Sequence, residues 1–123
     1  MKGQALVSLL VFAAVGMIVT SAAVAITIIN SQGSSKFTQG EEAIVVAEAG
    51  ADNTLLRILR DPGGSLDFDE TLIIGNGTAD ISHDPVAKTI TSVGVVGSFK
   101  RKVQITYTYD NNILKVVTWQ EID

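Results

Sequence analysis

The feature of this sequence that most limits its fold is an apolar run near the N-terminus that carries no charge. Residues 5–29 hold 20 apolar residues out of 25, with no Asp, Glu, Lys or Arg among them. As a helix from Gln4 to Ile29 the run would extend about 39 Å, and a bilayer core is about 30 Å thick. A helix in a soluble core would show a polar stripe, which this run lacks, so the pattern favours a membrane span.

The remaining residues have the composition of an ordinary soluble domain. All of the charged residues lie outside residues 5–29, and the 123-residue chain contains no cysteine. The lack of cysteine excludes disulfide frameworks, thiolate metal sites and thiol catalysis. The net charge of −4 argues against a nucleic-acid partner, since such proteins normally present a basic patch. We therefore expect one small domain joined to an apolar segment.

The apolar run can be processed in more than one way. It could stay uncut as a membrane anchor. It could also be a secretory signal peptide, with Lys2 as its positive end and cleavage after Ala25, because Ala23-Val24-Ala25 fits the small-x-small pattern. The apolar residues that continue past Ala25 are unusual after such a site, and a third route depends on the residues that precede the run.

A second helical pattern, residues 36–61, follows the polar stretch 30–35. Its apolar residues share one face at 100° per residue, and that face predicts packing against the rest of the domain: Phe37, Ile44, Ala47, Ala51, Leu55 and Ile58. Asp61-Pro62-Gly63-Gly64 predicts the end of the helix. Residues 30–35 contain Gly, Ser and Asn, which have low helix propensity. The sequence leaves open whether they form a hinge or continue one unbroken helix.

From Leu66 onward the pattern changes to a period of two. It predicts short strands in an antiparallel meander: Thr71–Ile74, Thr78–Ser82, Thr89–Val93, Lys100–Tyr109 and Ile113–Gln120. Asn76-Gly77 predicts a type I′ hairpin loop. The apolar face expected to pack on the helix comprises Ile90, Val103, Ile105, Tyr107, Val116 and Trp119.

These patterns predict an α+β fold. A long N-terminal helix, with a membrane-spanning first half, packs by its second half on a small antiparallel β-sheet, as in a ladle. About 60 residues of strand bury too little surface to be stable alone, so the helix is needed to complete the core. The expected organisation is a leader 1–3, a transmembrane or filament-core helix 4–29, a possible hinge 30–35, an amphipathic second half 36–61 and a β domain 66–123.

Two short motifs resemble those of type IV pilin-like proteins. The leader residues Lys2 and Gly3, followed by Gln4 and the apolar run, resemble a class III prepilin signal. The resemblance implies cleavage by a prepilin peptidase between Gly3 and Gln4, retention of the apolar helix, and a methyl group on the new terminus. Ala47-Glu48-Ala49-Gly50 is similar to a motif on the long helix of minor pilins and tip pseudopilins, which implies a subunit contact at Ala47, Glu48, Ala49 and Gly50.

One position departs from the family pattern. Typical members carry Glu at the fifth mature position, where it is thought to pair with the N-terminal amine of the next subunit. Here that position is Ser8, which cannot form the pair. A lone charge buried in an apolar segment is costly and needs a partner. The departure therefore favours a minor or tip subunit of a type IV pilus-like filament or secretion pseudopilus.

The resemblance also implies partners and a location. The partners would be membrane lipid, other pilin-like subunits, the prepilin peptidase and an assembly platform, with no nucleic acid. The chain would be a single-pass protein of the bacterial cell membrane and then part of a cell-surface filament. Lys2 favours a cytoplasmic N-terminus, which leaves the β domain extracytoplasmic. The alternative is a secreted or single-pass membrane-anchored β-rich binding domain with no filament role.

Sequence patterns typical of catalysis are lacking, so we expect no enzyme and no cofactor. His83 is the one histidine, and its place before Asp84 and Pro85 predicts a surface loop. The serines have no nucleophile-elbow context. An acidic group made of Asp67, Asp69, Glu70, Asp80 and Asp84 offers oxygen ligands, but its spacing fits no EF-hand loop, and a solvated acidic surface is expected.

Overall fold

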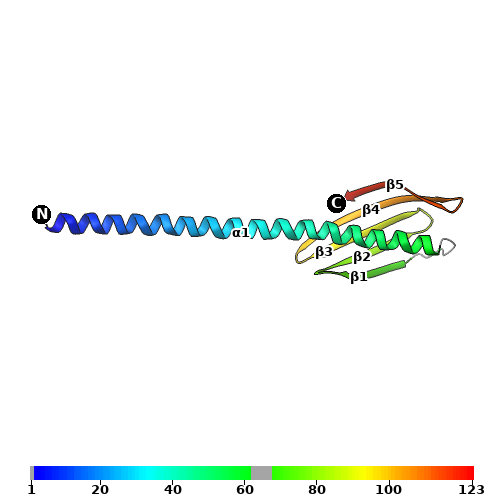
Figure 1. Cartoon of the computed structure of the whole chain (residues 1–123), viewed down its shortest axis with the longest axis horizontal. Helices are drawn as coiled ribbons and strands as arrows, with labels where there is room; N and C mark the ends of the chain where they lie inside the picture. Colours follow the sequence, from blue (N-terminus) through cyan, green and yellow to red (C-terminus); the bar gives the residue numbers. More distant parts are fainter. Residues whose placement is uncertain (1, 62–67) are drawn as a thin grey trace. The chain divides into compact units, whose positions relative to one another are not determined.

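A computed structural model of the chain describes residues 2–61 and 68–123. One helix is followed by five strands, which are α1 (Lys2–Arg60), β1 (Phe68–Ile74), β2 (Gly77–Asp84), β3 (Thr89–Val96), β4 (Phe99–Asp110) and β5 (Ile113–Ile122). The chain divides into two compact units, residues 1–36 and residues 37–123. The fold is α+β, as the sequence predicts, with one long N-terminal helix packed on an antiparallel sheet (Figure 1).

Residues 30–35 are helical throughout. The predicted end of the helix is only partly described, since α1 ends at Arg60 while Pro62, Gly63 and Gly64 lie outside the described residues. Two basic side chains, Arg57 and Arg60, occupy the last turn, where a cation interacts favourably with the helix dipole.

The five strands form one sheet in sequence order, β1-β2-β3-β4-β5, with every neighbouring pair antiparallel. Three of the connections are loops of only two residues, and each uses left-handed backbone conformations. Gly75 and Gly97 have φ values of 58° and 59° in the β1–β2 and β3–β4 loops, and Asn111 and Asn112 have φ values of 51° and 63° in the β4–β5 loop. Glycine and asparagine tolerate these values better than other residues, which is why they mark the loops in the sequence.

The loop between β1 and β2 lies one residue earlier than predicted. The sequence indicates Asn76-Gly77 as the two loop residues, but Gly77 is already the first residue of β2 and pairs with Ile74. The loop is Gly75-Asn76, and Gly75 supplies the positive φ. Gly77 serves packing instead, because a Cβ there would lie 2.7 Å from the Val95 carbonyl oxygen and 3.1 Å from Val46 Cγ2.

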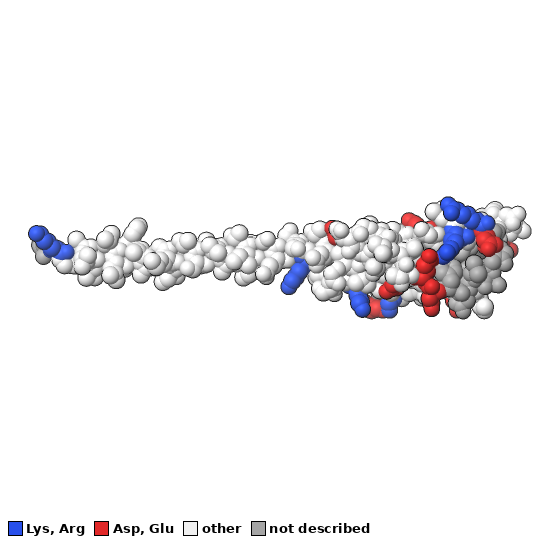
Figure 2. Space-filling model, turned by 90° about the horizontal axis from the view of Figure 1, so that it is seen from below, with Lys and Arg blue, Asp and Glu red and all other residues white. Residues whose placement is uncertain are grey.

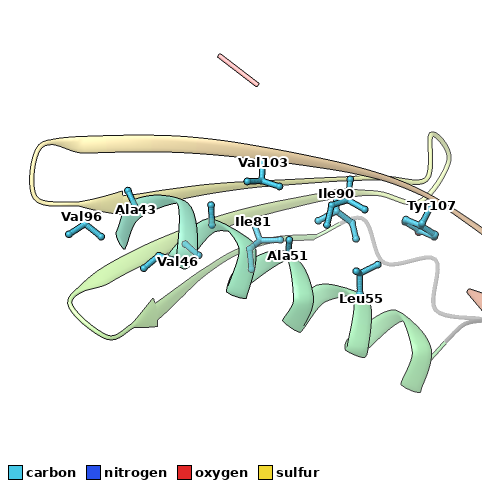
Figure 3. Close-up of a cluster of buried hydrophobic side chains, with 12 residues drawn as sticks. Ala43, Val46, Ala51, Leu55, Ile81, Ile90, Val96, Val103 and Tyr107 are labelled. Carbon is cyan, nitrogen blue, oxygen red and sulfur yellow. The ribbon is translucent and has the colours of Figure 1, made fainter. Parts of the chain in front are cut away.

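The core lies between the second half of α1 and one face of the sheet (Figure 3). On the helix, the buried residues recur at intervals of three and four, as expected of a single helical face: Ala43, Val46, Ala47, Gly50, Ala51, Thr54 and Leu55. Alternate residues of the strands meet them, namely Ala79, Ile81, Ile90, Val96, Val103, Ile105 and Tyr107. The predicted helix face was therefore correct at Ala47, Ala51 and Leu55.

Small residues on both surfaces bring the helix close to the sheet. Gly94 of β3 lies under α1, where an added Cβ would be 2.0 Å from the Ala43 carbonyl oxygen and 2.6 Å from the Ala47 backbone nitrogen. Ala79 of β2 pairs with Gly94 in the sheet, and Ala43, Ala47 and Ala79 are all fully buried. Only glycine fits at residue 94, because the atoms it would meet belong to the helix backbone.

Three residues predicted for the core are exposed. Phe37 is 70% exposed, Val116 is 39% exposed and Trp119 is 40% exposed. Val116 and Trp119 do lie on the helix side of the sheet, since they pair with Tyr107 and Ile105 of β4. Small residues of α1, β2 and β3 bring the helix close to those two strands, however, and most of β5 at the sheet edge is left exposed.

Candidate functional site

The first candidate site is the surface of the apolar helix segment. Every described residue up to Thr38 is exposed, including large side chains such as Leu10, Phe12 and Ile18. α1 is long and apolar enough to cross a membrane, and it is the one such helix among the described residues. Apart from blue atoms at the N-terminal end, the charged atoms in Figure 2 gather over the C-terminal part of the chain, and residues 3–35 contain none. Such a surface needs a covering of lipid or protein.

Three hydroxyl side chains of this segment are satisfied within the helix. The hydroxyls of Thr20, Ser21 and Thr27 donate to the carbonyl oxygens four residues earlier, at 2.8, 2.8 and 2.9 Å. Polar groups in the hydrocarbon layer need such partners because no water is present there to bond them. The segment can therefore enter an apolar environment without leaving these three hydroxyls unbonded.

The predicted processing residues lie at the start of the same helix. Lys2, Gly3 and Gln4 are helical and exposed, and a Cβ added at Gly3 would meet no atom within 4 Å. Ser8, at the position of the family's Glu, is also exposed. No described part of the chain covers these residues, and cleavage between Gly3 and Gln4 stays a prediction.

The motif Ala47–Gly50 is divided between two surfaces. Ala47 and Gly50 face the sheet and are buried, and a Cβ at Gly50 would lie 2.8 Å from Ser92 Oγ. Glu48 is exposed and Ala49 is half-buried. Within this chain, the small residues of the motif serve the close approach of helix and sheet. Only Glu48 and Ala49 have surface to offer the predicted subunit contact.

His83 is not in a surface loop. It lies on β2, is 3% exposed, and its Nε2 is 2.6 Å from the hydroxyl oxygen of Tyr107 on β4. The strand ends two residues later than predicted, at Asp84, whose carboxylate accepts hydrogen bonds from the backbone N–H groups of Val86 and Ala87. The alternation of Ala79, Ile81 and His83 on one face was the signal that sequence reasoning missed.

The buried pair joins β2 to β4 across the core face of the sheet. Burial raises the pKa of Tyr107 above its usual value of 10.0, and the nearby Asp84 carboxylate raises it further. A tyrosine hydroxyl that keeps its proton cannot act as a base. Among the described residues, no group of three or more His, Asp or Glu side chains is placed to hold a metal ion. Asp67, one member of the predicted acidic group, lies outside the described residues.

Two ion pairs join parts of the C-terminal unit. Arg57 near the end of α1 pairs with Glu70 of β1, and Arg101 of β4 pairs with Glu121 of β5 at 2.5 Å. All four side chains are at least one-third exposed, so each pair adds only about 0–1 kcal/mol to stability. They link neighbouring elements and form no catalytic arrangement.

Comparison with protein-family models, with curated proteins and with solved structures gives no match. The features that bear on function are therefore those of the chain itself. They are the uncharged apolar surface of residues 5–29, the residues Lys2 and Gly3 that come before it, and the sheet packed on the second half of the same helix.

Proposed function

We propose that this chain is a structural subunit of a type IV pilus-like filament or a secretion pseudopilus. The observation that carries the proposal is the first half of α1, which has an exposed apolar surface and no charge between Lys2 and Lys36. A membrane can cover that surface before assembly, and the same segments of other subunits can cover it afterwards. One segment would thus serve both as anchor and as filament core.

Small side chains on the segment support packing between copies. Ala13, Ala14, Gly16, Ala22 and Ala23 would let neighbouring helices approach closely, as small residues do in membrane helix pairs. A plain membrane anchor tolerates the same residues but makes no use of them. The assembly partners in this account are other pilin-like subunits, a prepilin peptidase and an assembly platform in the membrane.

The sheet domain would face the outside of the cell. Lys2 is the one positively charged side chain on the N-terminal side of the apolar run, and positive residues favour the cytoplasmic side of a membrane. The C-terminal unit would then be extracytoplasmic, and its exposed residues would contact neighbouring subunits or external surfaces.

Ser8 supports a minor or tip position. A subunit at the tip has no neighbour above it whose amine needs neutralising, so an acidic side chain at residue 8 would have no amine to pair with there. Immunogold labelling of filaments from the source cells tests this position. Label at one end, or sparse label, is expected, whereas dense label along the whole filament would exclude a tip or minor role.

The N-terminal residue of the mature protein tests the filament proposal against the simpler alternatives. Peptide mapping by mass spectrometry of the protein isolated from its own cells should find a chain that begins at Gln4. A chain that begins at Ile26 would be a secreted domain without the apolar helix. An uncut chain would be a single-pass anchored domain, and either result would contradict the proposal.

A further inference from the structure

The proposed cleavage would create a charge in a segment that otherwise has none. Residues 4–35 contain no Asp, Glu, Lys or Arg, and the first turn of α1 holds no acidic side chain. A protonated α-amine on Gln4 would therefore be the only charge on this stretch of helix. No carboxylate of the same stretch could pair with it.

Two effects oppose a positive charge at this position. The N-terminus of a helix carries a positive partial charge, which disfavours a cation placed beside it. An apolar surrounding also disfavours an unpaired charge, since the lost hydration is not replaced. Ser8 lies one turn after Gln4, on the same face of the helix, and contributes only a hydroxyl. An uncharged terminus is therefore favoured once the segment is covered by other helices.

We propose that Gln4 removes this charge by cyclising to a pyroglutamyl residue, an inference that rests on the proposed cut after Gly3. The neutral α-amine nitrogen attacks Cδ of its own side-chain amide, and a bond forms between nitrogen and Cδ. The bond from Cδ to Nε2 breaks, and the departing nitrogen takes a proton from the attacking amine and leaves as ammonia. The reaction needs no oxidant, reductant or cofactor. Gln4 is exposed on the helix, so its side chain is free of the core.

The product suits the rest of the segment. The cyclic terminus is an uncharged amide, so Ser8 faces no cation and needs no negative charge to complement one. Glutamine at residue 4 and serine at residue 8 then form a consistent pair, in which neither residue contributes charge. The lactam N–H that results is not a basic amine and cannot accept a methyl group as the open amine does, so the two modifications compete for the same terminus.

Mass spectrometry of the protein from membrane and sheared-filament fractions tests the proposal. An isotope-labelled synthetic peptide that begins with residues 4–12 is added at lysis to report cyclisation during handling. The native N-terminal peptide should be lighter than the open form by the mass of one ammonia molecule. The cyclised fraction of the native peptide should exceed that of the labelled peptide. The native peptide should also resist Edman degradation until a pyroglutamyl aminopeptidase is added. An open Gln4, with a free or a methylated amine, would overturn the inference and leave the proposed function standing. A chain that begins elsewhere would overturn both.

Two substitutions test the electrostatic reason. Gln4→Asn keeps an amide but cannot cyclise, because the ring would have only four atoms, so its amine stays charged. Among chains cut after Gly3, the fraction found in filaments should fall several-fold for Gln4→Asn. Ser8→Glu should restore assembly in the Gln4→Asn background, where it has a cation to pair with, and lower assembly in the Gln4 background, where it has none. An effect of Ser8→Glu in the same direction in both backgrounds would contradict the charge argument.

Discussion

Gly50 of α1 lies directly against Ala79 of β2, so that a Cβ added at residue 50 would be 2.7 Å from the Cβ of Ala79. The same added atom would be 2.8 Å from Ser92 Oγ, and Ser92 is fully buried. Helix and sheet meet here without room for a methyl group. A glycine inside a helix costs about 1 kcal/mol relative to alanine. At residue 50 the close packing against the sheet is the reason for a glycine.

Gly50→Ala should lower the free energy of unfolding by about 1–3 kcal/mol, the usual cost of overfilling a packed core. Denaturant unfolding of the full chain in detergent micelles, followed by circular dichroism, measures the effect. Gly40→Ala is the matched control, because residue 40 is on the same helix with no atom within 4 Å of an added Cβ, and it should be neutral or slightly stabilising. Adding Ala79→Gly to Gly50→Ala should recover part of the loss. Equal stability of the two single variants would contradict the contact.

Gly94→Ala should be more harmful than Gly50→Ala. The added Cβ would meet the carbonyl oxygen of Ala43 and the backbone nitrogen of Ala47, and backbone atoms cannot move aside without shifting the helix. We expect a loss near the upper end of about 1–3 kcal/mol in the same unfolding measurement. A variant as stable as the parent chain would mean that the helix does not lie this close to β3.

These glycines show where prediction from sequence succeeds and where it stops. The change from helical spacing to alternation was enough to predict the α+β fold, the five strands and their order, because each pattern reports which side of an element is buried. The sequence pattern does not indicate how closely two elements pack against each other. The sequence indicates Gly77 as a loop residue, and Gly94 follows the predicted strand Thr89–Val93, yet both are packing positions that only the assembled core reveals.

The errors at the edges of the sheet have a common cause. Val116 and Trp119 are three residues apart and both lie on the helix side because the β4–β5 register shifts between Thr106 and Tyr107, but one helix is too narrow to cover five strands. Sequence periodicity indicates the face of a strand and not the extent of what covers it.

The processing residues Lys2, Gly3 and Gln4 came from a resemblance alone, and no packing interaction within the chain could have indicated them.

Tyr107→Phe should destabilise the chain near neutral pH by about 1–3 kcal/mol, because it removes a buried hydrogen bond to His83 Nε2. The substitution should also change how the free energy of unfolding depends on pH above neutrality. The pKa of Tyr107 is raised in the folded chain, so between pH 10 and that higher value the unfolded chain has lost a proton that the folded chain keeps. The contribution of Tyr107 to the free energy of unfolding is therefore constant below pH 10 and falls as the pH rises above 10.

Unfolding measured from neutral pH upward checks the assignment. The Tyr107→Phe variant should lack the part of the loss of unfolding free energy in alkali that is due to Tyr107. Tyr109→Phe, on the same strand, should retain it, since Tyr107 is still present and the Tyr109 hydroxyl donates to Asn112 in the loop that follows, at 3.3 Å. If both variants lose stability in alkali as steeply as the parent, Tyr107 is not the group responsible.

Val15→Lys should weaken retention of the chain in membranes. A lysine at the centre of a membrane helix costs about 2.5–3.5 kcal/mol on insertion scales. Val45→Lys is the control, since Val45 is on the same helix and is exposed to a similar degree, 59% against 53% for Val15, but lies beyond the apolar segment. Flotation of membranes from cells that express each variant gives the comparison. Equal loss of both variants from the membrane would show that residues 5–29 are not the anchor.

The central claim is that one apolar helix serves first as membrane anchor and then as filament core. The most direct test is to shear filaments from the source cells, purify them away from membranes, and identify their proteins by mass spectrometry. We expect this chain in the filaments, beginning at Gln4 and retaining residues 5–29, with a pool of the same chain in the membrane. Filaments without this chain, while its membrane pool is intact, would contradict the claim.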